Sequence, residues 1–190
     1  MIGASIGLTF AFSMVTAPLL YTWIGMSGIF WATGILSLVS ILVVLKMLPV
    51  APLLPRSPGW PRLSEVLSNP QLLSLNFGVF ALHVTQTAMW VLLPSVLVST
   101  GGLPVGEHWK VYLPAVLLSL TFMVPLIIAA EKHGQMKRIF NSAIALILIV
   151  QLGFAFLGQG LFALAFWLIL FFIAFNVLEA TQPSLISRLA

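Results

Sequence analysis

Charged residues are scarce in this chain, and aspartate and cysteine are missing altogether. Its 190 residues include 8 Lys and Arg and 4 Glu, so 6% are charged, whereas a soluble domain carries about 25%. A water-soluble fold of this size needs more polar groups than that to cover its surface. The composition therefore excludes a cytosolic enzyme, a nucleic-acid-binding domain and a disordered segment, and it indicates that lipid surrounds the protein.

The missing residue types also exclude several kinds of catalytic and metal-binding site. Without cysteine there are no disulfides, thiolate metal sites or cysteine nucleophiles. The sequence has no aspartyl pair, no H-E-x-x-H zinc motif and no Walker-type phosphate loop. The histidines at positions 83, 108 and 133 are expected at three different membrane depths, which is too far apart to bind one zinc ion at about 2.0–2.1 Å. We therefore expect no enzymatic activity, no metal site and no cofactor.

Long apolar runs dominate what is present, since 61% of the residues are apolar. A bilayer core about 30 Å thick is crossed by a helix of roughly 20 apolar residues. Six runs meet this length, and they are continuous rather than alternating, which favours helices over barrel strands. We predict an all-α integral membrane protein with six transmembrane helices, at residues 2–23, 29–48, 71–98, 108–130, 139–157 and 161–179.

The basic residues predict the orientation of these helices. Seven of the eight Lys and Arg fall at the ends and loops of one side, and Lys110 alone falls on the other. Because basic loops stay in the cytoplasm, both termini and the proline-rich segment 49–70 are expected there. The chain begins and ends beside apolar runs, so we expect it to be cut at both ends. The segment separates two helices, residues 1–48, from four helices, residues 71–190.

Polar side chains on the third predicted helix are the main candidates for a substrate or proton pathway. They recur at intervals of seven, three, one and three, which predicts one helix face: Asn76, His83, Gln86, Thr87 and Trp90. His83 and Gln86 lie near mid-span, where a polar group that faces lipid costs several kcal/mol. They are expected to face either neighbouring helices, as packing contacts, or a water-filled cavity. Histidine titrates near neutral pH, so a proton-linked role is open.

Two further features concern the other helices. Glu179 ends the sixth predicted helix, three residues after Asn176, and its expected partners are Lys132, Lys137 and Arg138 on the same side. This contact is either a salt bridge that holds helices together or a latch that opens in one transport state. In the first helix, small residues favour close helix packing, and Pro18 predicts a bend.

Several sequence strings are similar to one known family. They are residues 77–83, 93–94, 107–113, 124–125, 136–137, 171–176, 179–180 and 183–187. These strings resemble the second half of YajR-type transporters, which are members of the major facilitator superfamily. The resemblance implies a bacterial inner-membrane, twelve-helix secondary transporter, of which this chain would supply helices five to ten, a partial bundle.

The resemblance also implies roles for particular residues. Segment 49–70 would be the linker between the two halves, and Ala17-Pro18 would stand where an antiporter motif has a Gly-Pro pair. The loop from Glu131 to Arg138 would pair with Glu179. The implied function is proton-linked efflux of small organic molecules by alternating access, with the lipid bilayer, a small-molecule substrate, protons and the missing transporter helices as partners. The alternative is a truncated membrane protein that serves only as a structural or assembly partner.

Overall fold

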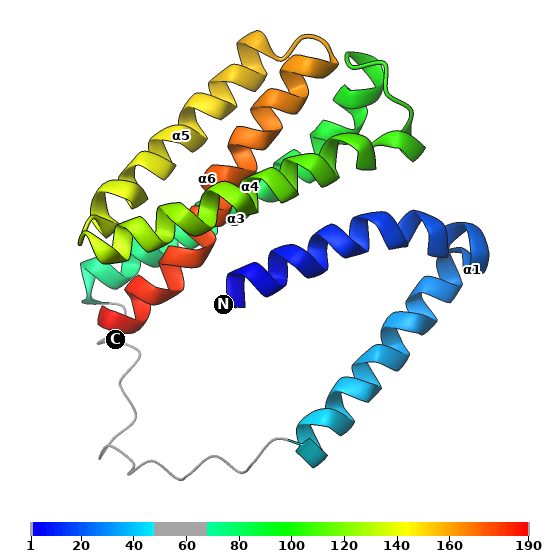
Figure 1. Cartoon of the computed structure of the whole chain (residues 1–190), viewed down its shortest axis with the longest axis horizontal. Helices are drawn as coiled ribbons and strands as arrows, with labels where there is room; N and C mark the ends of the chain where they lie inside the picture. The colour runs from blue at the N-terminus through cyan, green and yellow to red at the C-terminus, as the bar shows by residue number, and fades with distance from the viewer. Residues whose placement is uncertain (1, 48–67, 190) are drawn as a thin grey trace.

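The described part of the chain is helical throughout. The computed structural model describes residues 2–47 and 68–189 (Figure 1); the expected linker at 49–70 therefore lies almost entirely outside the described residues. No strand occurs within these two ranges. The elements in chain order are α1 (Ile2–Met47), α3 (Pro70–Ser99), the 3-10 helix η1 (Val105–Glu107), α4 (Trp109–Lys132), α5 (Met136–Leu157) and α6 (Leu161–Leu189).

The all-α membrane class is confirmed, but the expected count of six separate helices is corrected to five. Among the described residues, five helices are long and apolar enough to cross a membrane. The first two predicted helices are joined in α1, which has 46 residues and one non-helical position, Gly25 with φ 66° and ψ −178°. A straight helix of that length would measure about 69 Å. The kink at Gly25 instead gives two arms of about 33–35 Å, each matched to one bilayer crossing.

Gly25 is expected to be required for this kink, because a side chain at positive φ costs roughly 1–2 kcal/mol. We expect Gly25→Val to open the angle between the two arms. Spin labels on cysteines introduced at Phe12 and Leu36 would report a longer distance, in a chain that has no native cysteine. The control is Gly34→Val, because Gly34 also has open space around it but no positive φ. An unchanged distance in Gly25→Val would contradict the assignment.

The bend expected at Pro18 stays a prediction. Pro18 lies inside α1, where Gly25 has the non-helical backbone angles. Ala17 and Pro18 are both exposed on the N-terminal arm. A proline removes one backbone hydrogen bond but its φ is compatible with a helix, whereas the left-handed angles of Gly25 redirect the chain.

The other helices begin and end close to the predicted positions, with one exception. The Asn69 side chain accepts from the backbone N–H groups of Gln71 and Leu72, at 3.0 and 3.3 Å, and Pro70 occupies the first turn. Such a cap starts a helix. The exception is α6, which continues to Leu189 instead of ending at Glu179. The apolar run ends at Glu179, but the helical backbone continues past it. Glu179 therefore lies inside the helix.

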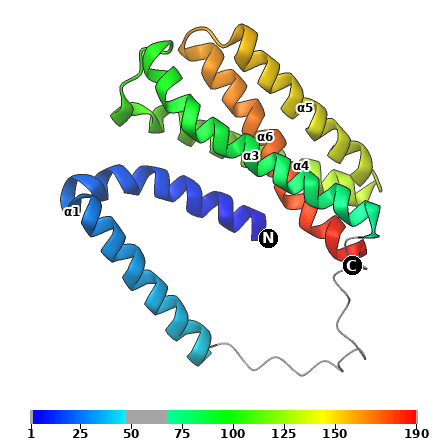
Figure 2. The ribbon, with the colours of Figure 1, turned by 180° about the vertical axis from the view of Figure 1, so that it is seen from behind.

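Helix α6 is the centre of a four-helix bundle made by α3, α4, α5 and α6. It packs against the other three, and Leu164, Leu168 and Phe171 are almost completely buried. Figure 2 shows the bundle from behind, with α1 folded beside it. The N-terminal arm of α1 contributes Ala11 and Met14 to the core. The second arm presents large exposed apolar side chains, such as Trp31 and Leu45, which require lipid or further helices around them.

The two ends of the bundle agree with the expected alternation of loops. The start of α3, the loop between α4 and α5 and the end of α6 gather at one end (Figure 1). The connections α3–α4 and α5–α6 lie at the other end. The basic residues Lys132, Lys137 and Arg138 therefore share the end at which α3 begins.

Candidate functional site

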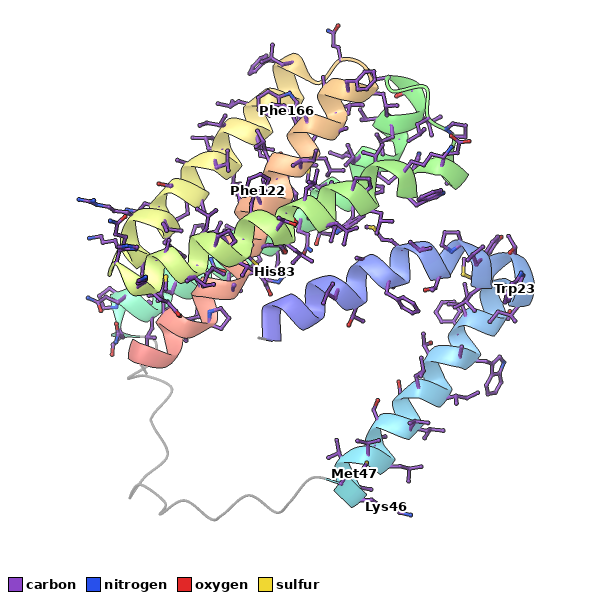
Figure 3. The ribbon with its side chains drawn as sticks, in the orientation of Figure 1. Trp23, Lys46, Met47, His83, Phe122 and Phe166 are labelled. Atoms are coloured by element: carbon purple, nitrogen blue, oxygen red, sulfur yellow. The ribbon has the colours of Figure 1, made fainter. Side chains whose placement is uncertain are left out.

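A histidine and a carboxylate meet across two helices of the bundle. His83 on α3 and Glu179 on α6 approach to 3.7 Å between Nε2 and Oε2, with 48% and 36% of their side chains exposed. Figure 3 shows His83 midway along the bundle. Both residues lie within helices long enough to span the bilayer. At that depth a lone charge is costly, so pairing stabilises both side chains.

A hydrogen bond on the other side of the His83 imidazole shows which ring nitrogen donates. His83 Nδ1 lies 2.9 Å from the carbonyl oxygen of Val79, and a carbonyl only accepts, so Nδ1–H is the donor. Nε2 then faces the Glu179 carboxyl. At 3.7 Å the two groups are in contact but not hydrogen bonded.

A second polar contact holds α6 to α4. Asn176 Nδ2 donates to Ser119 Oγ at 2.7 Å, and Ser119 Oγ donates to the Val116 carbonyl at 2.7 Å. Asn176 and Glu179 are three residues apart, yet they contact different neighbours, so α6 is clamped between α3 and α4. Sequence reasoning missed Ser119. Nothing in its apolar surroundings distinguishes it from Thr121, whose hydroxyl only bonds its own helix at Leu117.

The other residues predicted on the polar face of α3 do not take part in the contact between His83 and Glu179. Thr87 Oγ1 donates to the His83 carbonyl at 2.8 Å, a bond within the helix. Trp90 packs against the rings of Tyr112 and Phe172, with centroids 5.1 and 6.1 Å away. Asn76 is exposed and Gln86 is half-buried. The structure therefore brings His83 to Glu179, places Trp90 in an aromatic cluster, and leaves the pathway role of the others a prediction.

The expected contact between Glu179 and the basic loop is absent from the described residues. Their ion pairs join Glu179 to His83 and Lys110 to Glu107. The loop residues Glu131, Lys132, Lys137 and Arg138 are all exposed. The reason is the length of α6, because ten residues follow Glu179 and place it about 15 Å from the helix end. A latch in another state stays a prediction.

The comparisons with known proteins give one consistent result, although no family model matches the chain. It is 37% identical to the inner membrane transport protein YajR of Escherichia coli (strain K12), over 98% of this chain and 42% of YajR. It is 28% identical to an uncharacterized transporter of Buchnera aphidicola subsp. Acyrthosiphon pisum (strain APS), over 98% of this chain and 49% of that protein. An uncharacterized transporter from subsp. Schizaphis graminum (strain Sg) is 30% identical over 75% of this chain.

The chain thus spans less than half the length of these curated relatives. Their names are those of transporters, not of enzymes, and the first is an inner membrane protein. The five membrane-length helices agree with that location. The chain is an integral inner-membrane protein whose sequence fits a segment of a YajR-like transporter.

Proposed function

We propose that this chain is part of a secondary active transporter of the major facilitator superfamily, which exports small organic molecules with proton linkage by alternating access. Two kinds of observation support the proposal. The relatives are named as transport proteins, and ionisable residues inside membrane spans are functional candidates by default. The observation that carries the proposal is the contact between His83 and Glu179 on two different spanning helices.

The geometry of that pair suits proton coupling. As long as α3 and α6 stay in register, one proton satisfies both side chains. If a change of conformation moves α3 relative to α6, the contact is lost, and the imidazole and the carboxyl then gain or lose protons independently of each other. A change of conformation is thereby linked to proton uptake or release, which is the physical requirement for a proton-driven cycle.

The surroundings of the pair favour a small organic substrate with an apolar body. The ring of His83 lies edge-on to Phe175, with centroids 6.3 Å apart. Trp90 of α3, Tyr112 of α4 and Phe172 of α6 form an aromatic cluster. Sites of this kind bind ligands through aromatic surfaces and a few polar groups.

The chain alone is expected not to transport, because rocking requires two halves around the site and the chain matches less than half of its relatives. The test reconstitutes this chain and full-length E. coli YajR in separate proteoliposomes, with a fluorescent organic dye as the trial substrate. We expect dye flux driven by a pH gradient in the YajR vesicles and background flux in the others. Flux from the chain alone would contradict this, and a YajR flux independent of the pH gradient would contradict proton linkage.

The competing function is that of a structural or assembly partner without transport. One observation favours it: the large apolar side chains of the second arm of α1 are exposed in the part of the chain that the structure describes. Co-reconstitution of the chain with the remaining parts of YajR separates the two. Restored flux supports a transporter segment, and stable association without flux supports the assembly role.

A further inference from the structure

A polar hollow lies at the basic end of the bundle, where the chain turns from α4 into α5. It has a volume of about 550 Å³. Gly134, with φ 63°, makes the turn, so the end of α4 and the first turns of α5 border the same hollow. The residues that line it are His133, Gly134, Gln135, Lys137, Arg138 and Asn141. None of them takes part in the His83–Glu179 contact or in the aromatic cluster, so the hollow is separate from the candidate functional site.

The lining of the hollow carries unpaired positive charge. Lys137 and Arg138 are both exposed, and neither belongs to an ion pair in the part of the chain that the structure describes. Gln135 and Asn141 add amide groups, which donate hydrogen bonds. Glu131, the acidic residue of this loop, lies outside the lining. Two cations and two amide donors around one hollow fit an anion with several oxygen atoms, such as a phosphate group.

The hollow lies at the depth of the lipid headgroups. Helices α4 and α5 are both long and apolar enough to cross a membrane, and the hollow lies where one ends and the other begins. The 22 residues of α5 measure about 33 Å, close to the roughly 30 Å of the hydrocarbon core. When α5 crosses this core, its first turn therefore lies at the edge of the bilayer, beside the phosphate groups of the lipids.

An exposed apolar stripe continues from the hollow along α5. Lys137 and Asn141 are followed by Ile144, Leu148 and Leu152 at spacings of three and four residues, which places all of them on one helix face. Between 49% and 61% of each of the three apolar residues is exposed. A molecule with an anionic head and apolar chains would contact the hollow and the stripe at once, whereas a soluble anion would contact the hollow alone.

We propose that the hollow binds the headgroup of an anionic phospholipid, whose acyl chains lie along the exposed stripe of α5. Basic residues next to the ends of membrane-spanning helices attract anionic headgroups. That general attraction acts on every exposed cation near the surface, whereas the hollow adds amide donors and a defined shape. Binding is therefore expected to depend on the residues that line the hollow and not only on the number of charges in the loop. The inference needs only the membrane location and not the proposed proton linkage.

Native mass spectrometry of the purified, delipidated chain tests the ligand without any flux measurement. Phosphatidylglycerol, which is anionic, is titrated into the detergent solution, and zwitterionic phosphatidylcholine is the comparison. We expect phosphatidylglycerol to bind about tenfold more tightly or better, because each nearby Lys or Arg strengthens binding roughly fivefold. An excess of inorganic phosphate is expected not to displace it, since phosphate has no acyl chains. Equal binding of the two lipids, or displacement by phosphate, would overturn the proposal.

Three substitutions distinguish the hollow from general attraction to the surface. Lys137→Gln removes a cation from the lining, and Lys132→Gln, the matched control, removes a cation of the same loop that lies outside the lining. We expect Lys137→Gln to weaken phosphatidylglycerol binding about fivefold, and Lys132→Gln to weaken it clearly less. Asn141→Ala, which changes no charge, is expected to weaken it roughly threefold through the lost hydrogen bond. Equal losses in the two lysine variants, or an unchanged affinity in Asn141→Ala, with helix content retained by circular dichroism, would overturn the proposal.

Discussion

Replacing the residue aligned with His83 by leucine in a full-length relative is expected to reduce export about tenfold or more, without reducing membrane insertion. Leucine cannot bind a proton, and it leaves the carboxyl of Glu179 without the partner that lies 3.7 Å away here. Coupling free energies of 1–3 kcal/mol between two ligands correspond to changes of about 5–150-fold. Export into inverted vesicles, divided by transporter content from an immunoblot, is the measurement.

The same experiment contains its own comparisons. Leucine at the position aligned with Gln86 is also expected to lower export, if the polar face of α3 lines a cavity. Leucine at the position aligned with Val91, which is 70% exposed here, is expected to have no effect. If export is untouched by the His83 substitution, the polar stripe is only a packing surface and the proton role is wrong.

Gly153→Val is expected to destabilise the bundle by about 1–3 kcal/mol, the range for overpacking a filled core. Gly153 is buried on α5, and a Cβ there would lie 2.5 Å from the Trp167 ring of α6. The clash involves the rigid fused part of the indole, so the two helices have to separate. Thermal unfolding in detergent, followed by circular dichroism, would show a lower midpoint.

A second substitution identifies the cause of this loss. Trp167→Leu removes the obstructing ring, and the double variant Gly153→Val with Trp167→Leu is expected to lose less stability than the sum of the single losses. Gly34→Val is the surface control, because nothing lies within 4 Å of its Cβ position. Simple additivity of the two single effects would show that α5 and α6 do not meet at Gly153.

Hydropathy predicted most of the fold, because lipid exposure demands long apolar runs whatever the packing. The cap at Asn69 and the turn at 158–160 are local signals, and the helices flanking them begin and end there. The gap between the first two predicted helices, residues 24–28, contains Gly25, where α1 is kinked. The end of α6 was missed because polar residues such as Glu179 end an apolar run without ending a helix.

The candidate functional site was less predictable than the fold. The spacing of residues along one helix shows which of them share a face, but it does not show which other helix packs against that face. His83 and Glu179 were both singled out, yet Glu179 was assigned to the basic loop, since charge alone favours Lys132, Lys137 and Arg138. Glu179 instead contacts His83 because of how α6 is aligned against α3. The residue pattern of one helix does not give that alignment. Ser119 was missed for the same reason, because isolated polar residues in apolar runs usually bond their own backbone.

The most direct test of the central claim, that His83 and Glu179 meet between α3 and α6, is nitrogen NMR of the chain in lipid bilayers. With ¹⁵N-labelled histidine, the signals of His83 are assigned by their loss in His83→Leu. We predict a protonated Nδ1 and an Nε2 signal that shifts when Glu179 is replaced by Gln, while the signals of His108 and His133 stay in place. An Nε2 signal that ignores this substitution would show that the two side chains do not meet in the membrane.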